Sequence, residues 1–332
     1  MTADDRSVLL TAAEIAAYAG PDLYLFLGIS TAGSSVHEAF PVWAPRLAPG
    51  GVMRGVDLPA EAAPEQYRSL LVAMRDNPHV RGAVVTSHKL SLYRAAADLF
   101  DHTDPLVDIT HEVNSIQARD GRLGGFARDA QSLDLILDTT ATAQPAPERP
   151  IICIGAGGSA IALMLAVGLD VHATIRAGRP LRRAPGAIRG SLTVLGRRQA
   201  ALDEIAAVRE RAGLTSVDIR LVLARGPEEI GAVTRTATPG TVLANATGLG
   251  KLSPGSPVDG ADAFPAGVVA WDFNYRGPLT FLSQARAAGV TVEDGWDYFL
   301  AGWAAGLAAI GDQSLTDDLF GWVREVSAVL RP

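Results

Sequence analysis

A lysine and an aspartate, Lys89 and Asp129, are the side chains of this 332-residue chain whose positions suit proton transfer. The apolar run 82–86 is typical of a short buried strand, and Lys89 follows where that strand ends. Asp129 follows a second strand and a turn signal further along the chain. Ligands of open α/β sheets bind outside the carboxyl ends of strands, so both side chains could reach one substrate oxygen. We expect the aspartate to hold the lysine, and the lysine to pass a proton to or from an alcohol.

Structural interpretations of the same two residues stay open. A lysine after a strand is usually a solvated residue at the start of a helix, because lysine side chains are mostly exposed. Asp129 could equally be the N-cap of a helix that contains residues 132–137. Burial would lower the pKa of the lysine and a carboxylate would raise it, so the sequence leaves its working pKa open.

A glycine-rich segment has the chemistry of a phosphate-binding turn. The apolar run Ile151–Ile154 predicts a strand, and the following Gly-Ala-Gly-Gly-Ser-Ala predicts a turn into a helix. The glycines allow close approach of a pyrophosphate, and the helix N-terminus offers N–H groups to the phosphates. Packing alone can also require such a turn. The candidate cofactor-binding residues here are Gly155, Gly157, Gly158, Ser159 and Ala160.

The end of the next strand would distinguish between the dinucleotides that such a turn can hold. We place this strand at 192–198, where no acidic residue follows to hold a ribose 2′-hydroxyl. Arg197 and Arg198 suit the 2′-phosphate of NADP instead, with NAD as the alternative. In a rival register, residues 171–176 form the strand and Arg179 binds the phosphate. With the first choice, the Arg-rich stretch 176–190 is an insertion typical of a solvated loop.

Composition excludes several classes of protein. The chain is 48% hydrophobic with a formal net charge of −7, which argues against broad attraction to nucleic acid or to a membrane. No uncharged apolar run approaches the length that spans a bilayer, and no signal sequence opens the chain. The single cysteine, Cys153, lies in an apolar run and fits a buried residue of a cytoplasmic protein. The few histidines show no ligand spacing with Cys, Asp or Glu, so we expect no metal.

Strands and helices alternate along the chain, which predicts an α/β protein with parallel sheets. The length suggests about two domains, and the Pro- and Ala-rich stretch 139–150 marks their boundary. We expect an α/β substrate-binding and catalytic domain at 1–138 and a Rossmann-type dinucleotide-binding domain at 148–292. Helices at 293–332 are expected to pack back on the first domain.

Three segments resemble, in order, motifs of the shikimate and quinate dehydrogenases. They are Val-Thr-Ser-His-Lys at 85–89, Glu-Val-Asn-Ser at 112–115 and the run from Asp-Gly to Asp at 120–129. In that family the lysine and the aspartate are the catalytic pair, and a threonine and an asparagine contact the substrate. The resemblance therefore implies catalytic roles for Lys89 and Asp129, and substrate-binding roles for Thr86 and Asn114.

Further motifs extend the resemblance over about residues 23–310. The hydroxyl-rich loop 28–35 resembles the loop that binds the substrate carboxylate, and the glycine turn resembles the family's dinucleotide turn. Asn-Ala-Thr at 245–247, the Asp-x-x-Tyr run at 272–275 and Asp-Gly at 294–295 resemble motifs around the nicotinamide and the substrate. The roles that follow are substrate binding for Ser34, Ser35 and Tyr275, and cofactor binding for Arg197, Asn245, Thr247, Phe273 and Gly295.

Three departures from the family pattern indicate a variant substrate. The glutamine that holds a substrate hydroxyl is Gly302 here, and the serine loop is shorter. Ala127-Arg128 replaces the family's Asn-Thr before the aspartate. Arg128 could pair with an additional anionic group of the substrate, although a solvated surface arginine is the simpler interpretation.

The resemblance implies an NADP-dependent dehydrogenase of the shikimate dehydrogenase type, which interconverts a ring alcohol and a ketone. The substrate would be a shikimate-like ring acid, an amino-shikimate or a cyclitol, and shikimate itself would place the enzyme in aromatic amino acid biosynthesis. The alternative is a non-catalytic sensor of ring acids on the same fold. We expect neither a nucleic-acid nor a membrane partner, and the oligomeric state stays open between monomer and homodimer.

Overall fold

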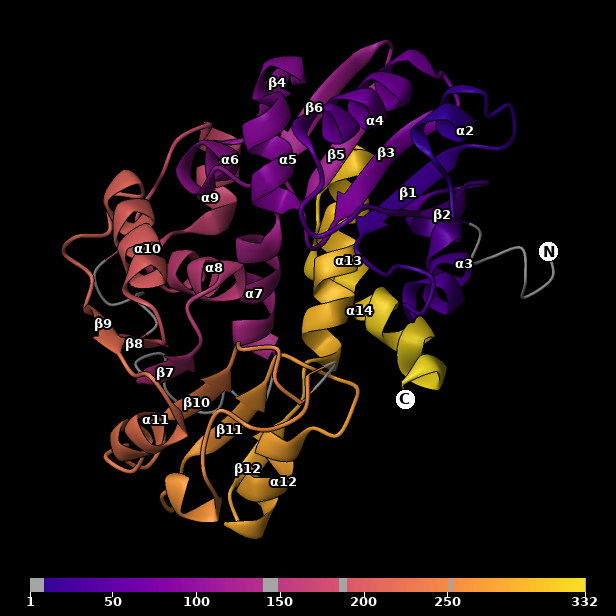
Figure 1. Cartoon of the computed structure of the whole chain (residues 1–332). Coiled ribbons are helices and arrows are strands. Elements are labelled where there is room, and N and C mark those ends of the chain that lie inside the picture. The colour runs from indigo at the N-terminus through magenta and orange to yellow at the C-terminus, as the bar shows by residue number, and fades with distance from the viewer. Residues whose placement is uncertain (1–8, 140–148, 185–189, 251–252, 332) are drawn as a thin grey trace. The chain divides into compact units, whose positions relative to one another are not determined.

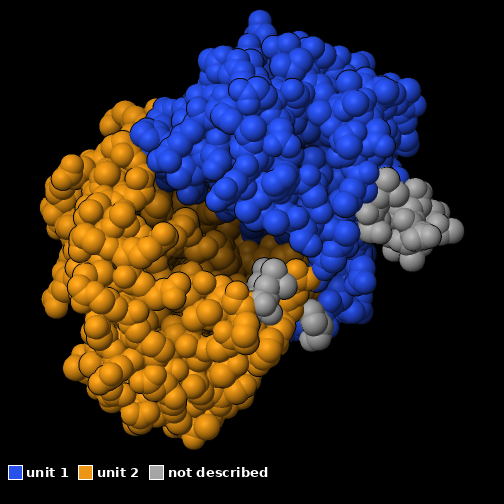
Figure 2. Space-filling view, viewed as in Figure 1, with its two compact units in different colours: residues 1–128, 302–331 blue, residues 129–301, 332 orange. Residues whose placement is uncertain are grey.

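The computed structural model describes residues 9–139, 149–184, 190–250 and 253–331, and the chain divides into two compact units. Unit 1 comprises residues 1–128 and 302–331, and unit 2 comprises residues 129–301 and residue 332 (Figure 2). The division falls before helix α7 (Asp129–Thr139), whereas the expected boundary follows that helix. Most of the expected linker, residues 140–148, lies outside the described residues.

Unit 1 contains a mixed sheet with the strand order β2-β1-β3-β5-β6-β4 (Figure 1). Strand β1 pairs in parallel with β2 and β3, while β5 is antiparallel to both β3 and β6. The hairpin between β5 and β6 turns at Asp120 and Gly121, which both have the positive φ that a two-residue hairpin turn requires. The strands are β1 (Leu23–Gly28), β2 (Val52–Asp57), β3 (Val80–Val85), β4 (His102–Thr103), β5 (Ser115–Arg119) and β6 (Arg122–Phe126).

Apolar helix faces and the C-terminal residues complete the core of unit 1. In α4 the predicted stripe of Tyr67, Leu70, Leu71 and Met74 is buried. Near the end of the chain, the Trp303 ring lies 5.0 Å from the ring of Phe26. The helices are α2 (Ala12–Ala16), α3 (Val36–Leu47), α4 (Pro64–Asp76), α5 (Lys89–Ala96), η1 (Ala97–Leu99), α6 (Pro105–Thr110), the second part of α13 (Trp296–Ile310), α14 (Asp317–Ser327) and η4 (Ala328–Leu330).

Unit 2 contains a parallel sheet with the strand order β12-β11-β10-β7-β8-β9. The order reverses between β7 and β10, and ligands of doubly wound sheets bind at such a reversal. This architecture confirms the predicted α/β class with a Rossmann-type half. The strands are β7 (Ile151–Ile154), β8 (Leu192–Gly196), β9 (Ile219–Leu223), β10 (Val242–Asn245), β11 (Val269–Asp272) and β12 (Thr291–Glu293).

Helices cover both faces of the second sheet, with α7, α8 and α10 on one face and α11 and α12 on the other (Figure 1). Buried rings such as Phe264 and Phe281 fill the space on the α11 and α12 side. The remaining bounds are α8 (Gly158–Gly168), α9 (Val171–Ala177), α10 (Gln199–Arg211), α11 (Pro227–Thr234), η3 (Ala261–Ala263) and α12 (Thr280–Ala287).

The strand that follows α8 is β8, so the chosen register is confirmed and the rival one is wrong. Residues 171–177 form α9 because the Asp170 side chain caps it, accepting from the Ala173 N–H at 2.8 Å, and Gly178 ends it at φ 66°. The stretch after α9 is anchored to unit 2 rather than fully solvated, because Arg183 forms an ion pair with Asp134 of α7. Residues 185–189 of the Arg-rich stretch lie outside the described residues.

Candidate functional site

One edge of the first sheet gathers the predicted substrate-side residues. Strands β1, β3 and β6 end at this edge, and the antiparallel β5 begins there. Backbone hydrogen bonds join neighbouring ends: Thr86 N–H donates to the Leu27 carbonyl at 3.0 Å, and Val85 N–H to the Asn114 carbonyl at 2.8 Å. Asn114 N–H donates to the Phe126 carbonyl at 3.0 Å. Asn114 therefore lies just before β5, between Thr86 and the segment that leads to Asp129.

Lys89 is the first residue of α5, and its carbonyl accepts from the Val113 N–H at 3.3 Å. The preceding His88 is buried between two partners, the Tyr67 hydroxyl at 2.8 Å from Nδ1 and the Leu58 carbonyl at 3.2 Å from Nε2. A carbonyl only accepts, so Nε2 carries a proton, and in the neutral ring Nδ1 accepts from the tyrosine. Burial raises the pKa of Tyr67, which favours the donating hydroxyl. These contacts anchor the backbone that carries Lys89.

Asn114 is held by the segment that replaces the family's Asn-Thr. Its Oδ1 accepts from the Arg128 N–H at 2.9 Å and from the Ser115 hydroxyl at 3.1 Å. The Arg128 guanidinium lies 2.5 Å from an Asp104 oxygen and 5.0 Å from the centre of the Phe126 ring. Arg128 is therefore a buried, paired residue, and the expectation of a solvated surface arginine is wrong.

Asp104 serves two segments at once. One carboxylate oxygen caps α6 by accepting from the N–H groups of Leu106 and Val107, at 3.0 and 2.9 Å. The other accepts from Arg128 and from the Ala127 N–H. Burial raises the pKa of Asp104, while the Arg128 charge and these N–H donors oppose that shift. The pair thus fixes the chain immediately before Asp129, which is the first residue of α7.

The serine loop after β1 is pinned by a residue of the neighbouring strand. Asp57, at the end of β2, accepts from the N–H and the hydroxyl of Thr31 at 2.8 and 2.7 Å. Ser34 and Ser35 are half-buried, and the Ser34 hydroxyl accepts from the Val36 N–H at 3.4 Å. Both serines stand before α3 at the same edge as Thr86. The joint action of Lys89 and Asp129 stays a prediction.

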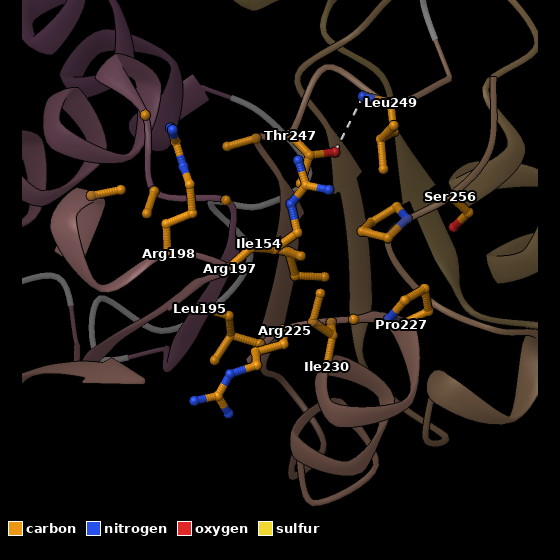
Figure 3. A pocket seen from close by; sticks show the side chains of 17 residues that line it. Ile154, Leu195, Arg197, Arg198, Arg225, Pro227, Ile230, Thr247, Leu249 and Ser256 are labelled. Atoms are coloured by element: carbon orange, nitrogen blue, oxygen red, sulfur yellow. Dashed lines mark hydrogen bonds between the residues drawn. The ribbon is translucent and has the colours of Figure 1, made fainter. Parts of the chain in front are cut away.

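Unit 2 contains a pocket of about 290 Å³ at the carboxyl ends of β7, β8, β9 and β10 (Figure 3). The glycine turn forms one wall through Gly155 and Gly157. Gly155 has φ 115°, and a Cβ there would lie 2.8 Å from the Ala246 carbonyl oxygen. A Cβ at Gly157 would meet nothing within 4 Å, so this position offers open backbone at the start of α8. Both features fit a turn that cradles phosphate.

Arginines give the pocket its charge. Among the 17 described residues that line it, Arg197, Arg198 and Arg225 are basic and none is acidic. In Figure 3, Arg198 stands at the left of the pocket and the Arg197 guanidinium lies in the middle of the view near Thr247, whereas the Arg225 guanidinium lies below, beside Leu195. Arg225 was not among the predicted residues, although it lies two positions after the end of β9 and ligands bind at such strand ends. The apolar residues Ile154, Ile230 and Pro227 also line the pocket and suit a flat base.

The other predicted cofactor residues divide into lining and buried groups. Thr247 lines the pocket, whereas the Asn245 side chain is fully buried and Ala160 lies inside α8. Gly158 and Ser159 are half-buried in the first turn of that helix. The side-chain oxygen Oδ1 of Asn245 accepts from the Thr247 N–H at 3.1 Å and from the Thr247 hydroxyl at 2.6 Å. Asn245 therefore holds Thr247 in place and does not itself line the pocket.

Aromatic rings surround the remaining predicted residues of unit 2. Phe273 is half-buried, 4.5 Å from the Trp271 ring and 5.0 Å from the Tyr298 ring. Tyr275 is buried against Trp296, at 5.4 Å, and against Phe299. A Cβ at Gly295 would lie 2.1 Å from the Phe273 carbonyl oxygen, so only glycine allows this approach. The geometry explains Gly295 by packing and leaves its predicted cofactor role as a prediction.

Neither a membrane-spanning helix nor a metal-binding cluster occurs within the described ranges. No helix there is long and apolar enough to cross a bilayer. The same residues contain no cluster of His, Cys, Asp and Glu suited to a metal ion.

No protein-family model and no curated protein matches the sequence. Solved structures do match over nearly the whole chain. The shikimate 5-dehydrogenase from Thermus thermophilus, solved with NADP(H) and shikimate, is 24% identical with a TM-score of 0.62, over 92% of this chain and 99% of its own. The quinate dehydrogenase from Corynebacterium glutamicum, solved with NAD, is 19% identical with a TM-score of 0.67, over 93% and 99%.

A further similar structure has another activity. The ligand-free 5-ketofructose reductase from a Gluconobacter species is 18% identical with a TM-score of 0.60, over 96% of this chain and 98% of its own. At these identities the likeness establishes the fold, so the resemblance predicted from the motifs is confirmed at the level of the fold.

Proposed function

We propose that this chain is an oxidoreductase of the shikimate dehydrogenase type that interconverts a ring alcohol and a ketone with NADP(H). The observation that carries the proposal is the edge of the first sheet, where four strand ends bring together Thr86, Lys89, Asn114 and the segment leading to Asp129. The fold shared with shikimate and quinate dehydrogenases supports the same reaction type.

Lys89 transfers the proton of the substrate hydroxyl, and Asp129 orients the lysine. Asn114 and Thr86 bind substrate hydroxyls, since both stand at the sheet edge where such groups would lie. Ser34 and Ser35 bind the acidic group of a ring acid, and Tyr275 contributes a further substrate contact. The cytoplasm, which the single buried thiol of Cys153 suits, is the proposed compartment.

The pocket of unit 2 is the proposed dinucleotide site. A bound nicotinamide dinucleotide supplies the hydride chemistry. The open backbone at Gly157 and the first turn of α8 would hold the pyrophosphate. Arg197 and Arg198 favour NADP over NAD because guanidinium groups bind a phosphate bidentately, and none of the described residues that line the pocket is acidic and able to hold a free 2′-hydroxyl.

The substrate class includes neutral polyhydroxy ketones as well as ring acids. A Cβ at Gly302 would meet nothing within 4 Å, so the position of the family's glutamine is open space. The likeness to a 5-ketofructose reductase supports testing such ketones beside shikimate, quinate and amino-shikimate.

Absorbance at the NADPH band tests the proposal with each of these substrates, using NADP and NAD separately. Lys89→Met should abolish turnover while leaving NADP affinity unchanged. Arg94→Met, an exposed residue of the same helix, is the control and should keep full activity. Turnover that survives in Lys89→Met would contradict the proton-transfer role, and failure of both dinucleotides to bind would contradict the function.

A further inference from the structure

We infer that Asp272 is a positioning residue of the dinucleotide pocket, which orients Thr247 through the side chain of Asn245. Asp272 is fully buried at the end of β11, beside Asn245 at the end of β10. Neither side chain lines the pocket, whereas Thr247 does. The inference rests on the proposed dinucleotide site and assigns to it a residue that acts through its neighbours.

Hydrogen bonds run from Asp272 to Thr247 without a gap. One carboxylate oxygen accepts from the Asn274 N–H and from its Nδ2, both at 2.9 Å. The other accepts from Asn245 Nδ2 at 3.0 Å. Asn245 Oδ1 then accepts from the Thr247 hydroxyl at 2.6 Å, and Thr247 Oγ1 accepts from the Leu249 N–H at 3.2 Å.

The charge of Asp272 determines the direction of the hydrogen bonds between side chains in this network. A carboxylate only accepts, so Asn245 must turn its Nδ2 toward Asp272 and its Oδ1 toward Thr247. The Thr247 hydroxyl must then donate to Asn245. With an amide in place of the carboxylate, one of the donors now facing Asp272 would meet a second donor.

Displacement of Thr247 would reshape the pocket wall. The Ala246–Thr247 backbone lies against the glycine turn, since a Cβ at Gly155 would be 2.8 Å from the Ala246 carbonyl oxygen and 3.1 Å from Thr247 N. Ala246, Thr247 and Leu249 line the pocket with Gly155. The network therefore sets the spacing between the two turns that flank the reversal of strand order.

The same network responds to pH. The pKa of Asp272 is raised to about 6, chiefly by burial and also by the Asp294 charge, although the hydrogen bonds from Asn274 and Asn245 oppose the shift. Glu293 is the other acidic group nearby, paired with Trp271 across the sheet. A proton on Asp272 makes one of its oxygens a donor, so the group no longer fixes the orientation of Asn245 and Asn274. Affinity for the dinucleotide should therefore fall as the pH falls through this range.

Isothermal titration of the full-length protein with NADP and with NAD, from pH 5 to pH 8, tests the inference. We expect Asp272→Asn to weaken binding about tenfold at pH 7.5, the loss of a buried hydrogen bond to a charged group. The 2′-phosphate of NADP itself titrates near pH 6, so the ratio of wild-type to variant affinity at each pH is the relevant quantity. This ratio should fall toward one at pH 5.

Three further substitutions keep the test decisive if Asp272→Asn does not fold. Thr247→Ser keeps the hydroxyl and should bind within about twofold of wild type, whereas Thr247→Val should lose about tenfold. Asp294→Asn keeps its acceptor for the Trp296 N–H but removes the neighbouring charge, so the pH midpoint of binding should move lower.

The outcomes separate the inference from the proposed function. Wild-type protein that binds neither dinucleotide would overturn the function. Tight wild-type binding, with unchanged affinity and an unchanged pH profile in Asp272→Asn and Thr247→Val, would overturn the inference alone. A midpoint that does not move in Asp294→Asn would overturn the assignment of the titration to Asp272.

Discussion

Alanine substitutions at two glycines of the same turn should have different effects, one on the stability of the fold and the other on dinucleotide binding. Gly155 has φ 115°, and a Cβ there would lie 2.8 Å from the Ala246 carbonyl oxygen and 3.1 Å from Thr247 N. Gly157 is the N-cap of α8 with φ −106° and ψ −167°, which any residue adopts, and its Cβ would meet nothing within 4 Å. Substitution of each by alanine adds the same methyl group to the two environments.

The expected magnitudes differ accordingly. Gly155→Ala places a side chain in a strained conformation and against backbone that must move, so we expect a loss of about 2 to 4 kcal/mol in the free energy of unfolding. Gly157→Ala should cost only about 1 kcal/mol, the difference between glycine and the poorer N-cap alanine, because the added methyl group meets nothing. Its methyl group would occupy the approach of a pyrophosphate, and one methyl-sized misfit reduces affinity about tenfold or more.

Urea unfolding followed by circular dichroism measures the first effect, and isothermal titration with NADP measures the second. The control is Gly213→Ala, because Gly213 has φ 68° and no neighbour within 4 Å of a Cβ, and it does not line the pocket. It should lose about 1 to 2 kcal/mol of stability from the backbone alone and no affinity. Equal losses of stability in Gly155→Ala and Gly157→Ala, or undiminished NADP binding by Gly157→Ala, would refute the reasoning.

Three further predictions concern stability. The pKa of Asp272 is raised from 3.8 to about 6 in the folded chain, so the stability that its protonated form contributes is present below pH 4 and is lost as the pH rises through 6. Between these values the free energy of unfolding should fall by about 3 kcal/mol more in wild type than in Asp272→Asn, as measured by urea unfolding across that range; equal slopes would contradict the shift. Tyr67→Phe removes the partner of a buried His88 nitrogen and should lower the free energy of unfolding by about 1 to 3 kcal/mol in the same assay. An unchanged free energy of unfolding would contradict a stabilising role for this hydrogen bond. On α13, Gly302→Ala should raise the melting temperature because nothing lies within 4 Å of its Cβ, whereas Gly306→Ala should lower it because its Cβ would lie 3.1 Å from the Ser115 hydroxyl; the opposite order would contradict this packing.

Local chemistry explains which elements were predictable. The capping box of Thr11 and Glu14 starts α2, and the apolar stripe of α4 is buried as its spacing predicts. The run Ile151–Ile154 forms β7 and leads into the glycine turn. The run from Ser314 to Asp317 has the spacing of a capping motif, but the N-cap of α14 is Thr316, whose side chain accepts from the Leu319 N–H at 3.1 Å.

The sequence by itself determined the class of fold, the glycine turn, and the order of strand ends at which Thr86, Lys89 and Asn114 stand. These features depend on periodicity, turn residues and cap residues, which act over a few positions. The residue types also predict NADP rather than NAD, since two arginines and no acidic residue directly follow β8.

Only the tertiary structure decided which polar groups meet. Arg128 pairs with Asp104, 24 positions away, and Asn245 meets Asp272, 27 positions away. Arg225 reaches the pocket only because β9 lies beside β8. A buried charge needs a partner wherever the chain supplies one, and strand order, not spacing in the sequence, determines which residue that is.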